Sequence, residues 1–246
     1  MFLTDKNIIV LSELDSTNNY AKQLLAQKAT QGTVVLAHYQ HSGRGQVGNS
    51  WESERGKNLL FSLILKPDFL IAAQQFYISK IVSLAMVKVL SQYLKGVKIK
   101  WPNDIYVGEQ KIAGMLIENW VKGNNLESSV VGVGLNVNQE KFLSDAPNPV
   151  SLKQLLNEEQ DITAILKEFL LQMDEYLHIL NRGLFDEIDE AYCKNLFRNS
   201  GWHRYKKGAT EFEAKITGIG SFGQLRLEKR DGTLSEFMFK EVEFVL

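Results

Sequence analysis

Residues 97–137 read VKIKWPNDIYVGEQKIAGMLIENWVKGNNLESSVVGVGLNV, and this stretch decides the fold class. It contains β-rich runs at 97–101, 105–107, 112–121 and 126–137, with glycine-bearing turns at 108–110 and 123–125. Strands that follow one another at such short intervals predict a meander in the middle of the chain.

Strands and helices are predicted before and after the meander. Strands are expected at 8–11, 33–39 and 58–65, and helices at 18–29, 72–94, 162–180 and 185–196. Asp15, Ser16 and Thr17 offer N-cap side chains to the first helix, and Gly183 separates the last two. Strands with helices around them predict an α+β domain.

The last part of the chain has a different character. From about Gly201 onward, glycines punctuate short β-rich runs at 211–217, 224–229, 234–239 and 242–245. Such a pattern predicts a small barrel. We therefore expect a main domain over residues 1–198 and a small domain over 199–246.

Charge and composition exclude several classes of protein. The 246 residues carry 28 Lys and Arg against 29 Asp and Glu, a net charge of −1, which argues against nucleic acid as a partner. Cys193 is the single cysteine, so no intramolecular disulfide forms, and a reducing, cytoplasmic location is expected. Lys80 and Lys88 interrupt the most apolar segment, 77–90, so neither a membrane span nor a signal peptide is predicted.

The polar segment 40–57 is too long for a hairpin turn and is the first candidate for function. Its residues 43–48 match the G-x-G-x-x-G pattern, but a strand follows instead of the helix that a dinucleotide site requires. The glycines let the backbone approach a ligand closely. Arg44 can bind a carboxylate or phosphate, and Trp51 can close over a ligand.

Two further clusters carry polar side chains. Lys100 and Asp104 belong to the block KWPND, and Lys111 begins the block KIAG across a short turn, so two cations and a carboxylate can converge on an anionic reactant. Glycines on the strand 132–138 imply close backbone approach, and Asn136 can hydrogen-bond a ligand. Histidines with metal-ligand spacing, a phosphate loop and a serine-hydrolase elbow are all missing from the sequence, so no protein-held metal site is predicted.

Taken in order, five blocks resemble biotin–protein ligases: Ser16-Thr17-Asn18, Gln40 with GRGQ at 43–46 and Trp51, KWPND at 100–104, KIAG at 111–114 and GVGLNVN at 132–138. The resemblance implies a catalytic domain of the class II synthetase-like, lipoate-ligase-like type, with a mixed sheet flanked by helices and an SH3-like C-terminal β-barrel. It further implies that biotin and ATP, with Mg²⁺, form biotinyl-5′-AMP. The biotinyl group then passes to a lysine of a biotin carboxyl carrier protein.

The resemblance also implies roles for individual residues. The catalytic residues would be Lys111, Arg44 and Asp104. The residues that bind biotin or its adenylate would be Ser16, Thr17, Asn18, Gln40, Arg44, Gly45, Gln46, Lys111 and Gly114. Trp51, Asn103 and Asn136 would lie on the nucleotide side. The loop from His41 to Gly56 would be a lid that keeps water from the adenylate.

The sequence departs from the family pattern and leaves alternatives open. Gln46, Val47 and Asn49 stand where many members of the family have basic residues. The loop therefore has fewer positive charges with which to hold the adenylate. Because the first block begins at Ser16, a monofunctional ligase without a DNA-binding domain is expected. The alternatives are a lipoate–protein ligase, against which the KWPND block argues, and a non-catalytic biotin-binding module. A homodimer through a sheet edge near 126–137 is possible.

Overall fold

A seven-stranded mixed sheet forms the centre of the computed structural model, which describes residues 8–46, 48–144 and 148–245. The strand order is β1-β2-β3-β7-β6-β5-β4, in which β1 and β2 are parallel and the other neighbours antiparallel. The strands are β1 (Ile8–Leu11), β2 (Val34–Ala37), β3 (Leu59–Leu65), β4 (Val97–Lys100), β5 (Asp104–Val107), β6 (Gln110–Lys122) and β7 (Asn125–Leu135). The meander predicted over 97–137 is thus confirmed.

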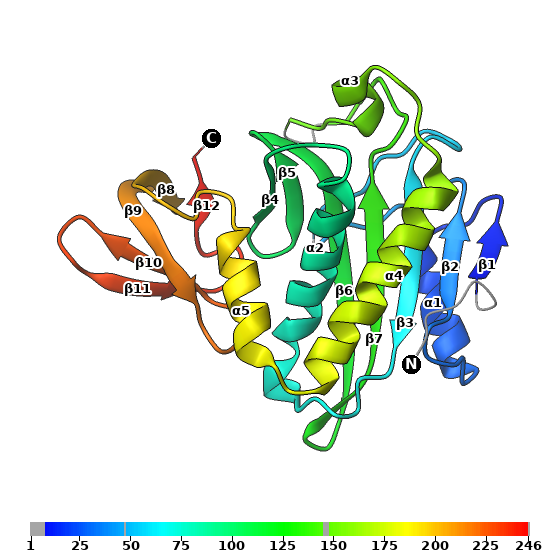
Figure 1. Ribbon diagram of the computed structural model, residues 1–246, viewed down its shortest axis with the longest axis horizontal. Helices are drawn as coiled ribbons and strands as arrows, with labels where there is room; N and C mark the ends of the chain where they lie inside the picture. Colours follow the sequence, from blue (N-terminus) through cyan, green and yellow to red (C-terminus); the bar gives the residue numbers. More distant parts are fainter. Residues whose placement is uncertain (1–7, 47, 145–147, 246) are drawn as a thin grey trace.

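Helices cover both faces of this sheet (Figure 1). They are α1 (Thr17–Ala26), the short 3₁₀ turn η2 (Ala72–Gln74), α2 (Phe76–Leu90), α3 (Leu152–Leu156), α4 (Ile162–Asn181) and α5 (Phe185–Lys194). In β3, Leu59, Phe61 and Leu63 belong to the core cluster that includes α2 and α4. Ile64 packs instead with Ala21 of α1, because successive strand residues face opposite sides of a sheet.

The α2 helix is apolar on nearly all sides because it packs on the sheet and also contacts α4 and α5. The helix predicted over 72–94 is shorter than expected, since η2 precedes it and α2 ends at Leu90. Among the described helices, none has the length and apolar character that crossing a membrane requires.

A second, five-stranded antiparallel sheet follows, in the order β11-β10-β9-β8-β12. Its strands are β8 (His203–Lys207), β9 (Thr210–Ile219), β10 (Leu225–Lys229), β11 (Leu234–Phe237) and β12 (Glu243–Phe244). The sequence analysis did not predict β8, whose residues HRYKK are mostly charged, although Tyr205 is fully buried. This sheet lies beside α5 and the β4–β5 hairpin (Figure 1).

The two sheets meet at the turn between β4 and β5. The indole Nε1 of Trp101 donates a hydrogen bond to the carbonyl oxygen of Gly223 at 2.8 Å, and Phe239 lies with its ring centroid 6.2 Å from that of Trp101. Trp101 is only 6% exposed, so this contact is part of the core. The C-terminal strands therefore pack against the KWPND block.

The dimer edge suggested near 126–137 is wrong. Strand β7 lies inside the sheet and pairs with β3 on one side and β6 on the other, so its backbone hydrogen-bonding groups are already used. The outer strands of the order are β1 and β4. Hydrogen bonds between Ile99 of β4 and residues 195 and 197 cover part of the β4 edge.

Candidate functional site

A cavity of about 530 Å³ lies over the face of the sheet that α1 covers. Its floor is bare backbone, because Gly114 of β6 pairs with Gly134 of β7, and Gly132 precedes Gly134 by two residues on the same face of β7. A Cβ atom on Gly132 would overlap the Asn18 side chain, and one on Gly134 would overlap the Trp51 indole. The glycines predicted to allow close approach are therefore required here.

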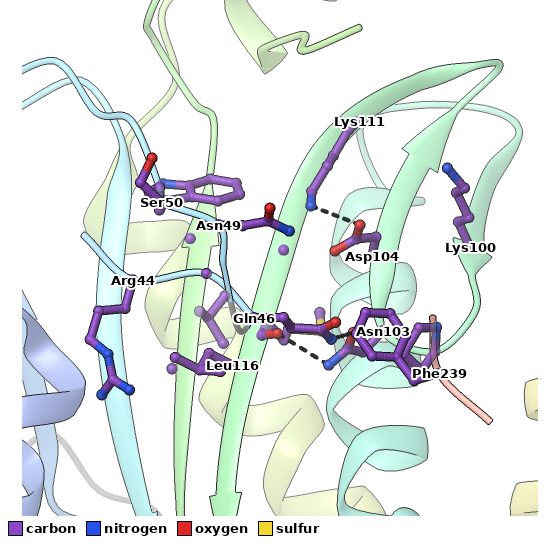
Figure 2. Close-up of a pocket in the computed structure, with 18 of the residues that line it drawn as sticks. Arg44, Gln46, Asn49, Ser50, Lys100, Asn103, Asp104, Lys111, Leu116 and Phe239 are labelled. Carbon is purple, nitrogen blue, oxygen red and sulfur yellow. Dashed lines mark hydrogen bonds and ion pairs between the residues drawn. The ribbon is translucent and has the colours of Figure 1, made fainter. Parts of the chain in front are cut away.

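The walls of the cavity come from elements far apart in the sequence. Twelve of the thirteen residues assigned to the site from the sequence line it together: Ser16, Thr17, Asn18, Gln40, Arg44, Gly45, Gln46, Trp51, Asn103, Asp104, Lys111 and Gly114. The KWPND turn, with Asn103, forms another wall. Phe239, Lys240 and Glu243 extend the lining from the C-terminal sheet, as Figure 2 shows for Phe239.

Hydrogen bonds hold the beginning of α1 and Gln40 in place at one end of the cavity. The Thr17 backbone N–H donates to Gln40 Oε1 at 2.8 Å, and its hydroxyl donates to the same oxygen at 3.1 Å. The Ser62 hydroxyl lies 2.8 Å from Thr17 Oγ1 and 2.6 Å from Asn18 Oδ1. Ser62 is fully buried in the otherwise apolar β3, so its hydroxyl is hydrogen-bonded within this network and not to solvent.

Lys111 and Asp104 form an ion pair inside the cavity. Lys111 Nζ lies 2.7 Å from Asp104 Oδ2, and Figure 2 shows the two side chains pointing toward each other from β6 and β5. Both side chains are half-buried, so the pair is screened less than one on the surface. Asp104 is thus placed to orient the lysine.

Lys100 does not join this pair. Its Nζ donates a hydrogen bond to the Tyr106 hydroxyl at 3.1 Å, and in Figure 2 its side chain lies apart from the Lys111–Asp104 pair. Burial lowers the pKa of Lys100, with the nearby charge of Lys111 adding to the effect and that of Asp104 opposing it. The predicted convergence of two lysines is therefore only partly correct, since both line the cavity but only Lys111 is paired with Asp104.

Arg44 also turns away from Lys111 (Figure 2). Its guanidinium hydrogen-bonds Asn19 Oδ1 at 3.0 Å and forms an ion pair with Glu118 at 3.4 Å. Glu118 also accepts hydrogen bonds from Asn18 at 2.9 Å and from Lys22 at 2.5 Å. Burial opposes ionisation of Glu118, but these donors and positive charges outweigh it and hold the pKa below its ordinary value.

Part of the segment 40–57 folds back on itself over the cavity. Gly45 N–H donates to the Asn49 carbonyl at 3.0 Å, and Trp51 N–H donates to the Gly43 carbonyl at 2.9 Å. Gln46 Nε2 donates to Asn103 Oδ1 at 2.8 Å, and Asn103 Nδ2 donates to the Met115 carbonyl at 3.1 Å. A neutral hydrogen bond therefore joins this loop to the KWPND turn where the family pattern would place a cation. The departure at Val47 lies outside the described residues.

Asn136 is not in this cavity, unlike the other predicted residues. It lines a second cavity of about 440 Å³, together with Phe142, Ser144 and Pro149. Its Nδ2 donates to the Val150 carbonyl at 3.1 Å. Trp51 and Lys111 line both cavities, so they lie at the boundary between them. The indole N–H of Trp51 is buried without a hydrogen-bond acceptor among the described residues.

Comparison with known proteins assigns the chain to a family. The sequence model of the Biotin/lipoate A/B protein ligase family matches residues 10–136. The bifunctional ligase/repressor BirA of Bacillus subtilis is 30% identical over 238 residues, which cover 92% of this chain and 71% of that protein.

The chain belongs to the biotin/lipoate A/B protein ligase family.

Other members agree with the observed architecture. The biotin protein ligase of Aquifex aeolicus, solved in complex with biotin and ATP, superposes with a TM-score of 0.80 at 25% identity, covering 98% of this chain and all of that one. The biotin–[acetyl-CoA-carboxylase] ligase of Paracoccus denitrificans is 32% identical over 130 residues, about half of each chain. The mixed sheet with flanking helices is therefore the catalytic fold of biotin protein ligases.

Ser62 and Glu118, two residues of the hydrogen-bond network at this site, belong to none of the blocks singled out in the sequence. Ser62 was hidden in the apolar run of β3, where a lone hydroxyl among LLFSLIL was the available signal. Glu118 lies on the same face of β6 as Gly114, because the two are four residues apart on a strand. This even spacing along a strand was the sequence signal that could have placed the Glu118 carboxylate beside the cavity.

Proposed function

We propose that the chain activates biotin with ATP to biotinyl-5′-AMP, releasing pyrophosphate, and transfers the biotinyl group to a lysine of a biotin carboxyl carrier protein. The names of its relatives support the first part, since they include a biotin–[acetyl-CoA-carboxylase] ligase and a biotin protein ligase solved in complex with biotin and ATP. The name of the Paracoccus relative supports a carboxylase as the source of the carrier.

The position of Lys111 between the two cavities carries the proposal. Activation joins two anions, the biotin carboxylate and the α-phosphate, so positive charge is needed where they meet. The Lys111 ammonium lies at that boundary and is oriented by Asp104. In this mechanism it draws the carboxylate toward the α-phosphate and stabilises the charge of the transition state.

The buried end of the first cavity suits the ureido head of biotin. Thr17, Asn18 and Gln40 present hydroxyl and amide groups that are already held by their neighbours, so binding costs little reorganisation, and the buried Ser16 lines the same end. Gly114 supplies part of the bare floor. The loop that carries Arg44, Gly45 and Gln46 closes the cavity from above and excludes water from the adenylate.

The second cavity suits the nucleotide. Trp51 offers an aromatic ring and Asn136 an amide near it. Asn103 lines the first cavity and holds Gln46, so its proposed role moves from the nucleotide side to the closure of the lid. Residues 199–246 form a small domain in this proposal, and its segment 239–244 completes the wall of the first cavity.

Magnesium enters as a companion of ATP. Among the described residues no group of three His, Cys, Asp or Glu side chains could hold a metal ion. Mg²⁺ commonly keeps several waters and binds substrate phosphates together with only one or two carboxylates. Because Asp104 is already paired with Lys111, the phosphates of ATP would hold the ion in this proposal, and the ion would offset phosphate charge.

A single experiment separates the three candidate functions. The purified chain is incubated with MgATP and either biotin or lipoate, and the acyl-adenylate is measured by mass spectrometry. Biotinyl-AMP alone is expected. Lipoyl-AMP would instead identify a lipoate–protein ligase, and biotin binding without any adenylate would identify a non-catalytic biotin-binding module.

A further inference from the structure

Two loops border the second cavity, and their bases are joined. The first is the segment 40–57, and the second begins after β7. Asn138 N–H donates to the Lys57 carbonyl at 2.7 Å, and the Gln139 Oε1 accepts from the backbone N–H of Glu54 at 2.9 Å. These contacts fix where the second loop starts and leave its outer part to be held by other groups.

The carboxylate of Glu52 holds that outer part. It accepts the backbone N–H of Ser144 at 2.7 Å and that of Leu143 at 2.8 Å, and the Gln139 Nε2 lies 3.3 Å from it. Backbone N–H bonds to an ionised carboxylate are stronger than neutral ones. Burial opposes ionisation of Glu52, but these donors outweigh it and lower the pKa.

The location of Glu52 gives this contact a consequence for ligand binding. Glu52 lines the second cavity and follows directly after Trp51, which lines both cavities. Ser144, which it holds, lines the second cavity from the opposite loop. The same carboxylate therefore ties the wall of the second cavity to the loop that covers the first.

We propose that Glu52 is a positioning residue for nucleotide binding: it fixes residues 143–144 against the biotin-covering loop and so shapes the second cavity. The inference rests on the proposed function, in which that cavity takes the nucleotide. Glu52 itself touches neither reacting group. Its removal should therefore weaken nucleotide binding and leave the ureido end unchanged.

The test compares Glu52→Gln with Glu54→Gln in the full chain. Both substitutions remove one negative charge from the same loop, but the exposed Glu54 side chain has no hydrogen bond or ion pair with the part of the chain that the structure describes. Calorimetry measures the affinity for biotin, and the affinity for α,β-methylene ATP in the presence of saturating biotin. Amide hydrogen exchange follows residues 143 and 144 in the unliganded chain.

Glu52→Gln is expected to weaken binding of the ATP analogue about tenfold, the loss of one charge-assisted hydrogen bond. Biotin affinity should stay within about twofold, and exchange at 143 and 144 should accelerate only in this variant. Unchanged nucleotide affinity, an equal loss of biotin affinity, or unchanged exchange overturns the inference. A wild-type chain that forms no biotinyl-AMP overturns the proposed function, whereas a normal wild type with an unaffected Glu52→Gln overturns this inference alone.

Discussion

Replacing Lys111 by alanine tests the proposed chemistry most directly. Loss of one preorganised donor that stabilises transition-state charge costs about 10²–10³ in rate, or roughly 2.7–4 kcal/mol. The structure predicts a further cost, because Asp104 would lose its partner at 2.7 Å and remain as an anion beside anionic reactants. Two like charges about 4 Å apart repel by about 4 kcal/mol at an effective dielectric constant of about 20.

This second cost can be separated from the first with a double variant. Asp104→Asn in the Lys111→Ala background removes the unpaired charge, so the double variant should form adenylate faster than Lys111→Ala alone. Lys122→Ala serves as the control, since Lys122 is on the same strand but its side chain is 80% exposed. The assay is single-turnover pyrophosphate release, with biotin affinity measured in parallel.

The reasoning is refuted if Lys111→Ala forms adenylate within about threefold of wild type. It is also refuted if biotin affinity falls as much as the rate, because Lys111 would then contribute to biotin binding and not specifically to the transition state. A double variant slower than Lys111→Ala would show that Asp104 contributes more than orientation of the lysine.

Three further predictions follow from the cavity. Gly132→Ala should lower biotin affinity by more than tenfold in calorimetry, since its Cβ would displace Asn18, and unchanged affinity would place biotin elsewhere. Ser62→Ala should weaken biotin about fivefold, from one lost hydrogen bond of about 1 kcal/mol, with the KM for ATP unaltered; an equal rise in both would contradict a local role. The pKa of Glu118 is lowered in the folded state, so its stabilisation is complete above its ordinary pKa and is lost as the pH falls below it. Wild-type stability in urea should therefore drop more steeply below about pH 5 than that of Glu118→Gln, and parallel curves would contradict this.

The strands of the main sheet could be predicted because each carries a local signal. Periodicity, glycine turns and β-branched residues mark the runs within 97–137, and all of them form strands. The order of those strands depends on pairings between distant segments, which no local pattern contains. The prediction of a sheet edge near 126–137 is therefore wrong, because β7 lies between β3 and β6.

The candidate site was predictable as a set of residues, but not as an arrangement. The residues gather because the start of α1, the loop after β2, the turn between β4 and β5 and the beginning of β6 all lie around the glycine floor. Where each side chain points depends on its partners in space. Arg44 turns to Glu118 and Lys100 to Tyr106, and both partners lie outside the blocks that carry the family resemblance. Phe239 likewise could not be placed at the cavity from the sequence, because it reaches the cavity from the far end of the chain.

The hydrogen bond from Trp101 to Gly223 has a consequence for protein engineering. The KWPND turn gains a buried partner from the C-terminal sheet, and the side chain of Phe76 closely approaches Gly223, leaving no space for a Cβ there. A chimera that receives its C-terminal segment from a relative would need a turn of matching shape at 220–223. Without it, the indole N–H of Trp101 would be buried with no acceptor, and the proposed catalytic residues, more than one hundred positions away, would lose their support.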